Sequence, residues 1–119
     1  MVATKYTFTC EQGANFNQVV TWKNANNAAI DNTNYSARMQ VRKDPGSEPV
    51  VILDTGNNKI ELGGASGEVQ LQLSASDTAA LAAGDYFYDL ELVNPSGEVS
   101  RIVEGVFSVN GEITRTEEE

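Results

Sequence analysis

Apolar and polar residues alternate with period two along most of this chain, most clearly in EVQLQLS, residues 68–74. The valine and both leucines of this run would face one side of a strand, and the two glutamines the other. Clusters of Gly, Asn, Asp, Ser and Pro separate the alternating runs after a few residues. Short strands joined by tight turns produce this pattern, so we predict an all-β fold.

Length and charge limit what such a fold can do. The 119 residues suffice for one domain with its own core, which we place at residues 1–112, followed by an acidic tail at 113–119. Eight basic residues face 17 acidic ones, a net charge of -9 that disfavours binding to nucleic acid or to an anionic membrane. The apolar runs are too short to span a membrane, and the first residues lack a secretion signal. A single cysteine fits synthesis in a reducing cytoplasm.

Several strands can be placed from the pattern. Residues 5–13 and 15–23 should form a hairpin, with one strand burying Tyr6, Phe8 and Cys10 and the other burying Phe16, Val20 and Trp22. The run YSARMQVRK should bury Ala37, Met39 and Val41. The continuous apolar run VVILD, residues 50–54, should be covered on both sides or lie under a neighbour. In SASDTAAL we expect the only helical turn, near residues 76–82, capped by Ser76.

The segment LAAGDYFYDLELV, residues 81–93, carries a recognisable structural signal. Leu81, Gly84 and Tyr86 stand at the spacing of a tyrosine corner, in which the tyrosine hydroxyl bonds to backbone just upstream. The following NPSG fits a type I turn with Gly97 in a G1 bulge. That turn sets Val93 opposite Val99, and Glu91 opposite Arg101.

If this register continues, both faces of the hairpin are apolar, and the face away from the core is a candidate assembly interface. Its residues would be Phe87, Val93, Val99, Val103 and Phe107. The alternative is a bulge near Gly105 that turns Phe107 and Val109 into the core. The sequence favours neither.

Catalytic and metal-binding patterns are sparse. The chain contains no histidine, which is the commonest general base and transition-metal ligand. Cys10 sits in an alternating strand and is expected to be a core thiol. Asp89 and Glu91 share a strand face, where solvated carboxylates beside Arg101 are the simplest interpretation. The loops AIDNTN and DTGNN fit turns better than calcium sites. We therefore expect no enzymatic activity, cofactor or metal.

Eight or so short strands without repeats or linkers favour one Greek-key β-sandwich of immunoglobulin-like topology, with a closed barrel as the competing architecture. The order and spacing of two segments, residues 8–42 and 67–109, add a resemblance. The first contains FTCEQGANFNQVVTW and NYSARMQVR, and the second contains GEVQLQLSASDTAAL, GDYFYDLEL and NPSGEVSRI. Together they resemble small immunoglobulin-like structural proteins of tailed bacteriophages, including the N-terminal domain of phage baseplate upper proteins.

This resemblance implies a component of the virion that works by protein–protein assembly, in a baseplate, tail, fibre or capsid. Its partners would be other phage structural proteins and copies of itself in a symmetric homo-oligomer. The alternative function is a carbohydrate-binding or adhesion module on the virion surface, for which the candidate residues are Tyr35, Asp31, Asn32 and Asn34.

Overall fold

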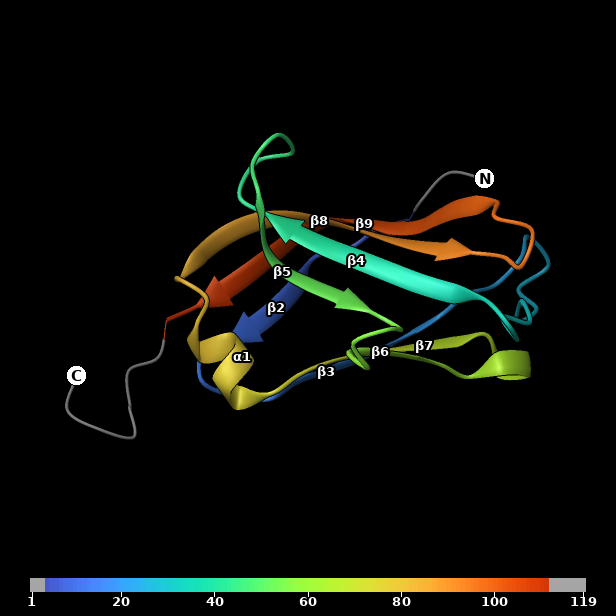
Figure 1. Cartoon of the computed structure of the whole chain (residues 1–119), viewed down its shortest axis with the longest axis horizontal. Coiled ribbons are helices and arrows are strands. Elements are labelled where there is room, and N and C mark those ends of the chain that lie inside the picture. Colours follow the sequence, from blue (N-terminus) through green and yellow to red (C-terminus); the bar gives the residue numbers. More distant parts are fainter. Residues whose placement is uncertain (1–3, 112–119) are drawn as a thin grey trace.

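Two β-sheets face each other in the computed structural model, which describes residues 4–111 (Figure 1). The large sheet has the order β1-β9-β8-β4-β5, with β2 also paired to β9, and the small sheet has the order β3-β7-β6. The strands of the large sheet are β1 (Thr4–Lys5), β2 (Phe8–Glu11), β4 (Ser36–Arg42), β5 (Pro49–Asp54), β8 (Gly84–Val93) and β9 (Val99–Asn110). Those of the small sheet are β3 (Phe16–Thr21), β6 (Ile60–Leu62) and β7 (Glu68–Leu73).

The predicted all-β sandwich is confirmed, and the alternation explains its core. β7 buries Val69, Leu71 and Leu73, and β4 buries Ala37, Met39 and Val41, as their patterns predicted. Burial of these two rows against each other removes apolar surface from water, which is the main force holding the sheets together. Four aromatic rings, those of Phe8, Phe16, Tyr88 and Phe107, pack in succession across the core with centroid distances of 5.0 to 5.9 Å.

The predicted N-terminal hairpin is wrong. β2 pairs in parallel with β9, and β3 pairs with β7 in the other sheet. The connection between β2 and β3 crosses the end of the sandwich, where the Gln12 side chain donates to Leu81 O and the Gly13 N–H to Thr78 Oγ1. Phe8 and Phe16 therefore face each other across the core. Tyr6 lies between β1 and β2 and is exposed, contrary to its predicted burial.

β5 also differs from its prediction. It pairs only with β4 and forms an edge of the large sheet, so Val50 and Ile52 are exposed while Leu53 is buried. Pro49 begins the strand, which fits an edge position because proline has no N–H to donate to a further strand.

Two short helical segments interrupt the strands. The helix α1 (Ala75–Ala79) begins one residue earlier than predicted because Ser74, not Ser76, is its N-cap. Ser74 Oγ accepts from the Asp77 N–H, and Asp77 Oδ2 accepts from the Ser74 N–H, which completes a capping box. A 3-10 turn that was not predicted, η1 (Gly64–Ser66), joins β6 to β7.

The entry to β8 has the hydrogen bond expected of a tyrosine corner. Leu81 and Tyr86 are buried, and the Tyr86 hydroxyl donates to Ala82 O at 2.6 Å. Gly84 has φ 142, a conformation that other residues rarely adopt. The β8–β9 turn also follows its prediction, since Val93 pairs with Val99 and Glu91 with Arg101.

The register then shifts, and this decides between the two interpretations of the hairpin. The extra residue is Ile102, so Leu90 pairs with Val103 instead of continuing the pattern. Val103 and Phe107 consequently turn into the core and are 5% and 0% exposed. The bulge lies three residues before the predicted Gly105. At Gly105 itself the Tyr6 backbone passes so closely that an added Cβ would lie 2.3 Å from Tyr6 O.

Within residues 4–111, no helix is long and apolar enough to cross a membrane. The predicted tail at 113–119 lies outside the described residues.

Candidate functional site

The outer face of the large sheet is the candidate functional site. Side chains that alternate with the buried ones of β4, β8 and β9 point away from the core and surround a shallow depression of about 860 Å³. Sheet register aligns them in rows across the strands, for example Ile52, Gln40, Asp89 and Glu104. The lining side chains of this outer face include Lys5, Arg38, Gln40, Arg42, Phe87, Asp89, Glu91, Arg101, Glu104 and Val106.

A network of ion pairs crosses this face from β4 to β1. Arg38 Nε lies 2.8 Å from Glu91 Oε1, and the Arg101 guanidinium lies 3.4 to 3.6 Å from carboxylate oxygens of Asp89, Glu91 and Glu104. Lys5 pairs with Glu104 at the far edge. Each pair is partly exposed and contributes little stability alone, about 0–1 kcal/mol. Their joint effect is to fix the positions of charges on the face.

The pKa values of two carboxylates of the network are shifted in opposite directions from their ordinary values. Burial, reinforced by the nearby charge of Glu91, raises the pKa of Asp89 above its ordinary value. A hydrogen bond from Lys5 lowers the pKa of Glu104 below its ordinary value. The carboxylates of Asp89 and Glu91 share Arg101 as a counter-ion.

Exposed apolar side chains lie beside the charges. Phe87 is 49% exposed next to Arg42 and Val106 in the register, and Ile52 is exposed next to Gln40. Of the five predicted interface residues, Phe87, Val93 and Val99 lie on the outer face, while Val103 and Phe107 are buried. The interface prediction therefore includes two residues that belong to the core.

Sequence reasoning missed Lys5, Ile52 and Glu104 as members of the outer face. The signal for Ile52 was Pro49, which marks β5 as an edge strand with one open face. Lys5 and Glu104 meet because β1 pairs in parallel with β9, and a partner so distant along the chain leaves no local signal.

Other candidate groups are occupied in holding the fold. Burial raises the pKa of the Cys10 thiol to about 11, so it stays protonated and a poor nucleophile near neutral pH. Within residues 4–111, no cluster of three His, Cys, Asp or Glu side chains is placed to hold a metal ion. The candidate sugar-binding residues make contacts that hold the loop before β4. Asp31 accepts from the Thr33 N–H, and the Tyr35 ring packs on Trp22. The side chain of buried Asn32 accepts from the Gly64 N–H and donates to Glu68 O.

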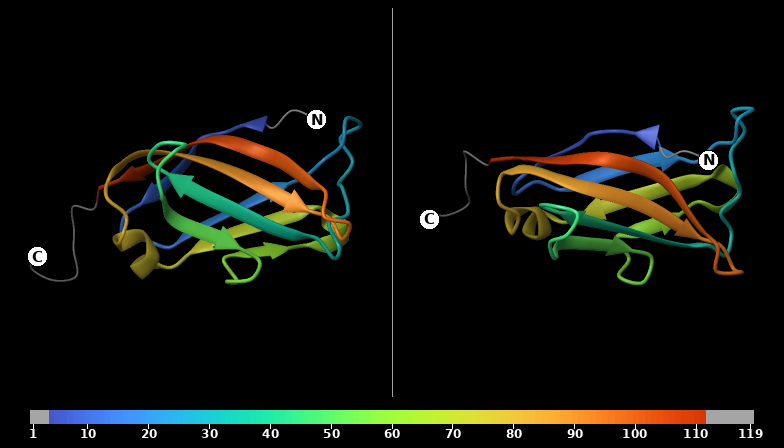
Figure 2. Two further views of the ribbon diagram at one scale, coloured as in Figure 1. Left: turned by 45° about the horizontal axis from the view of Figure 1, so that its top comes forward. Right: turned by 90° about the horizontal axis from the view of Figure 1, so that it is seen from above.

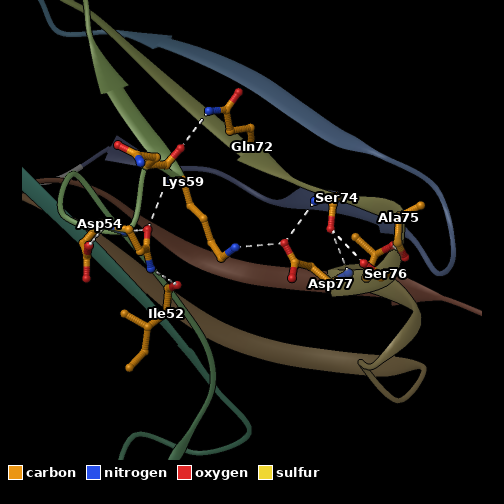
Figure 3. A network of polar contacts seen from close by, with 11 residues as sticks. Ile52, Asp54, Lys59, Gln72, Ser74, Ala75, Ser76 and Asp77 are labelled. Carbon is orange, nitrogen blue, oxygen red and sulfur yellow. Dashed lines mark hydrogen bonds and ion pairs between the residues drawn. The ribbon is translucent and has the colours of Figure 1, made fainter.

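A second polar network joins the β5–β6 turn to α1 (Figure 3). Asp54 and Asn57 exchange side-chain to backbone hydrogen bonds, and Lys59 Nζ lies 3.0 Å from Asp77 Oδ2. The pKa of Asp77 is lowered chiefly by the hydrogen bond from Lys59. Because every group in this network already has a protein partner, we assign it a structural role.

Comparisons with known proteins identify the fold and no family. No protein-family model and no curated protein matches the chain. Among solved structures, 142 chains match. One is the crystal structure of a chicken TCR, with a TM-score of 0.57 and 14% identity; the match covers 98% of this chain and 58% of that chain. At that identity the likeness establishes the fold alone: this chain is an immunoglobulin-like β-sandwich.

Proposed function

We propose that this chain is a structural, non-catalytic component of a bacteriophage particle that binds other protein chains through the outer face of its large sheet. The assignment to a phage is supported by the sequence resemblance of residues 8–42 and 67–109. The assignment to assembly is supported by the side chains of the outer face. Its partners would be other structural proteins of the particle and copies of this chain.

The distribution of charge is the observation that carries the proposal. Four of the eight basic residues of the chain line the depression on the outer face, together with only three of its 17 acidic residues. Two chains that each carry -9 repel each other at long range. The outer face is where that repulsion is locally cancelled, so a copy or an equally acidic partner can approach there.

The exposed apolar side chains supply the contact area. Phe87 of β8 is exposed opposite Arg42 in the register, and Ile52 is exposed on the edge strand β5. Aromatic and arginine side chains dominate the binding energy of protein interfaces when a partner excludes water from them. The fixed ion pairs would then set the orientation of that partner.

Incorporation of variants into phage particles tests the proposal. Phe87→Glu should remove the protein from purified particles, as measured by mass spectrometry, because it places a charge at the centre of the contact. Gln70→Glu adds the same charge at an exposed position of β7 on the opposite sheet and should be incorporated normally. Both variants should retain the wild-type melting temperature, since both positions are exposed.

Two outcomes would contradict different parts of the proposal. Normal incorporation of the Phe87 variant would exclude the outer face as the interface. Absence of the wild-type protein from particles would exclude the virion role, and light scattering of the two variants would then still report whether the outer face mediates self-association.

A further inference from the structure

The edge of β3 is a second surface of interest, because some of its backbone peptide groups have no hydrogen-bond partner in the described part of the chain. The Trp22 backbone N–H donates to Gly67 O at 2.9 Å, and this bond shows which residues of β3 point their peptide groups towards β7. Peptide groups of residues 16, 18 and 20 therefore bond to β7, and those of Asn17, Val19 and Thr21 point away from it. In the part of the chain that the structure describes, nothing hydrogen bonds to these outward peptide groups.

Other edges of the sandwich carry features that discourage further pairing, and β3 does not. β5 contains Pro49 and faces a bulge at Val41/Arg42, and β6 has three residues. β1 and β2 are two short strands interrupted at Tyr6, and they carry Lys5 and Glu11. The sequence of β3, FNQVVT, has six residues and contains no charge, proline, glycine or bulge. Natural proteins usually protect edges of that kind.

A groove runs alongside this edge. It has a volume of about 370 Å³ and lies between β3 on one side and β1 with Tyr6 on the other; Figure 2 shows β1 and β3 along the same side of the sandwich. Phe8, Trp22, Ile102 and Val103 also line it. Lys23 is the one charged residue of this lining among the described residues, so the groove lacks the acidic character of the rest of the chain.

Trp22 adds a specific unsatisfied group. Its side chain is 8% exposed and lines the groove, yet its Nε1–H has no hydrogen-bond partner among residues 4–111. Buried indole N–H groups usually find an acceptor. A carbonyl or side-chain oxygen brought into the groove, with a small shift of the ring, would supply one.

We propose that the β3 edge binds an extended segment of another protein, which adds to the small sheet as a fourth strand. Its backbone would pair with the peptide groups of Asn17, Val19 and Thr21, and its alternate apolar side chains would fill the groove beside Tyr6 and Trp22. The exposed Val19 side chain would give it a cross-strand neighbour on the outer surface. A single segment fits better than the edge of a second sandwich, because the groove lies between two sheet edges. This surface is distinct from the outer face of the large sheet.

A model peptide tests strand addition, because Trp22 is the only tryptophan of the chain and its fluorescence reports on the groove. The ligand is a capped peptide in which valine and threonine alternate between two terminal lysines, titrated to about 1 mM, a range that detects weak binding. Binding should change the Trp22 emission. It should also slow amide hydrogen exchange at Asn17, Val19 and Thr21 at least about tenfold, because each N–H gains an acceptor.

Two controls separate strand addition from general adhesion. The same peptide with proline in place of its central valine should not bind, since proline cannot complete the ladder. In the protein, Val19→Pro removes an outward N–H that β7 does not use, so the variant should fold and should lose peptide binding. Val19→Thr keeps the N–H and should bind as the wild type does.

Three results would overturn the proposal. One is unchanged exchange of the three amides at the highest peptide concentration, and another is equal protection in Val19→Pro. The third is a dimer in light scattering that Val19→Pro abolishes, which would assign the edge to a second copy of this chain. None of these results depends on incorporation into a phage particle.

Discussion

The sandwich has two open sides, which differ in the contacts that close them. On the side between β5 and β6, the connecting turn is tied to β7 by Gln72, whose side-chain amide donates to Asn58 O, and to α1 by the Lys59–Asp77 ion pair (Figure 3). On the side between β1 and β3 no turn connects the two strands, and a groove remains there in which Trp22 Nε1–H has no partner among residues 4–111. We call these the β5/β6 side and the β1/β3 side.

The difference shows which forces hold each side. The β5/β6 side buries Leu53 of β5 and Ile60 of β6 in the core, and it adds exposed polar contacts, each of which competes with water and contributes little. The β1/β3 side is held from within, where Phe16 of β3 packs on Phe107 of β9 at 5.3 Å. The first side is therefore held by the core and also at its surface, whereas the second depends on the core alone and leaves its surface available. Substitutions on the two sides should differ accordingly in their cost.

The largest expected effect is on the β1/β3 side. Phe107→Ala should lower the free energy of unfolding by about 3–5 kcal/mol, because a fully buried ring that joins the two sheets is replaced by a cavity. Urea denaturation measures the change. Phe87→Ala, on the opposite face of the same hairpin and half exposed, is the control and should cost less than about 1 kcal/mol. Equal costs for the two would contradict the assignment of Phe107 to the core.

The next effect concerns the close approach of the Tyr6 backbone, which follows β1, to Gly105 of β9. Gly105→Ala places a Cβ 2.3 Å from Tyr6 O at a residue with φ 152, which should cost about 2–3 kcal/mol through strain and displacement of Tyr6. Amide exchange at Tyr6, whose N–H donates to Glu104 O, should accelerate more than exchange in β7. Gly46→Ala, where nothing lies within 4 Å of the added atom, should leave stability unchanged. Slow exchange at Tyr6 in the Gly105 variant would show that β1 does not need this glycine.

Local patterns predicted the strands well and their partners poorly. The alternation in β4 and β7, the tyrosine corner and the NPSG turn depend on neighbouring residues, so the sequence contains what is needed to interpret them. The parallel pairing of β2 with β9 joins residues almost a hundred positions apart, and the hairpin expected in its place was the simpler local solution. A bulge in β9 was one of two alternatives, and the sequence indicated it near Gly105, whereas the structure has it at Ile102. It moved Val103 and Phe107 from the predicted interface into the core.

The candidate site shows the same division. Phe87, Val93 and Val99 could be predicted because the turn fixes their register with few intervening residues. The ion-pair network could be predicted only where it stays within that hairpin, as at Glu91 and Arg101. Its extension to Arg38 and Lys5 depends on strand order, which the sequence does not display.

A smaller effect is expected at the capping box of the β5/β6 side. Ser74→Ala should cost about 1 kcal/mol, since it removes the side-chain acceptor of the Asp77 N–H at the start of α1. The shift in thermal melting temperature measures it. Ser76→Ala is the matched control, because Ser76 is the residue that the sequence suggested as the cap. If the Ser76 variant lost as much stability as the Ser74 variant, the observed cap assignment would be wrong.

The smallest effect is the ion pair that closes the β5/β6 side. Lys59→Met should cost about 0.2–1 kcal/mol at neutral pH, because Lys59 and Asp77 are both partly exposed. The folded-state pKa of Asp77 lies below its ordinary value of 3.8, so folding favours the ionised form and this stabilisation is complete above that value. The difference between wild type and variant should therefore vanish as the pH falls through the folded-state pKa. Urea denaturation at a series of pH values measures it. Lys23→Met, at the groove of the β1/β3 side where the described residues offer Lys23 no ion pair, should show no such dependence. A pH-dependent loss in the Lys23 variant would mean that the β1/β3 side is also closed by charge, and the contrast between the two sides would fail.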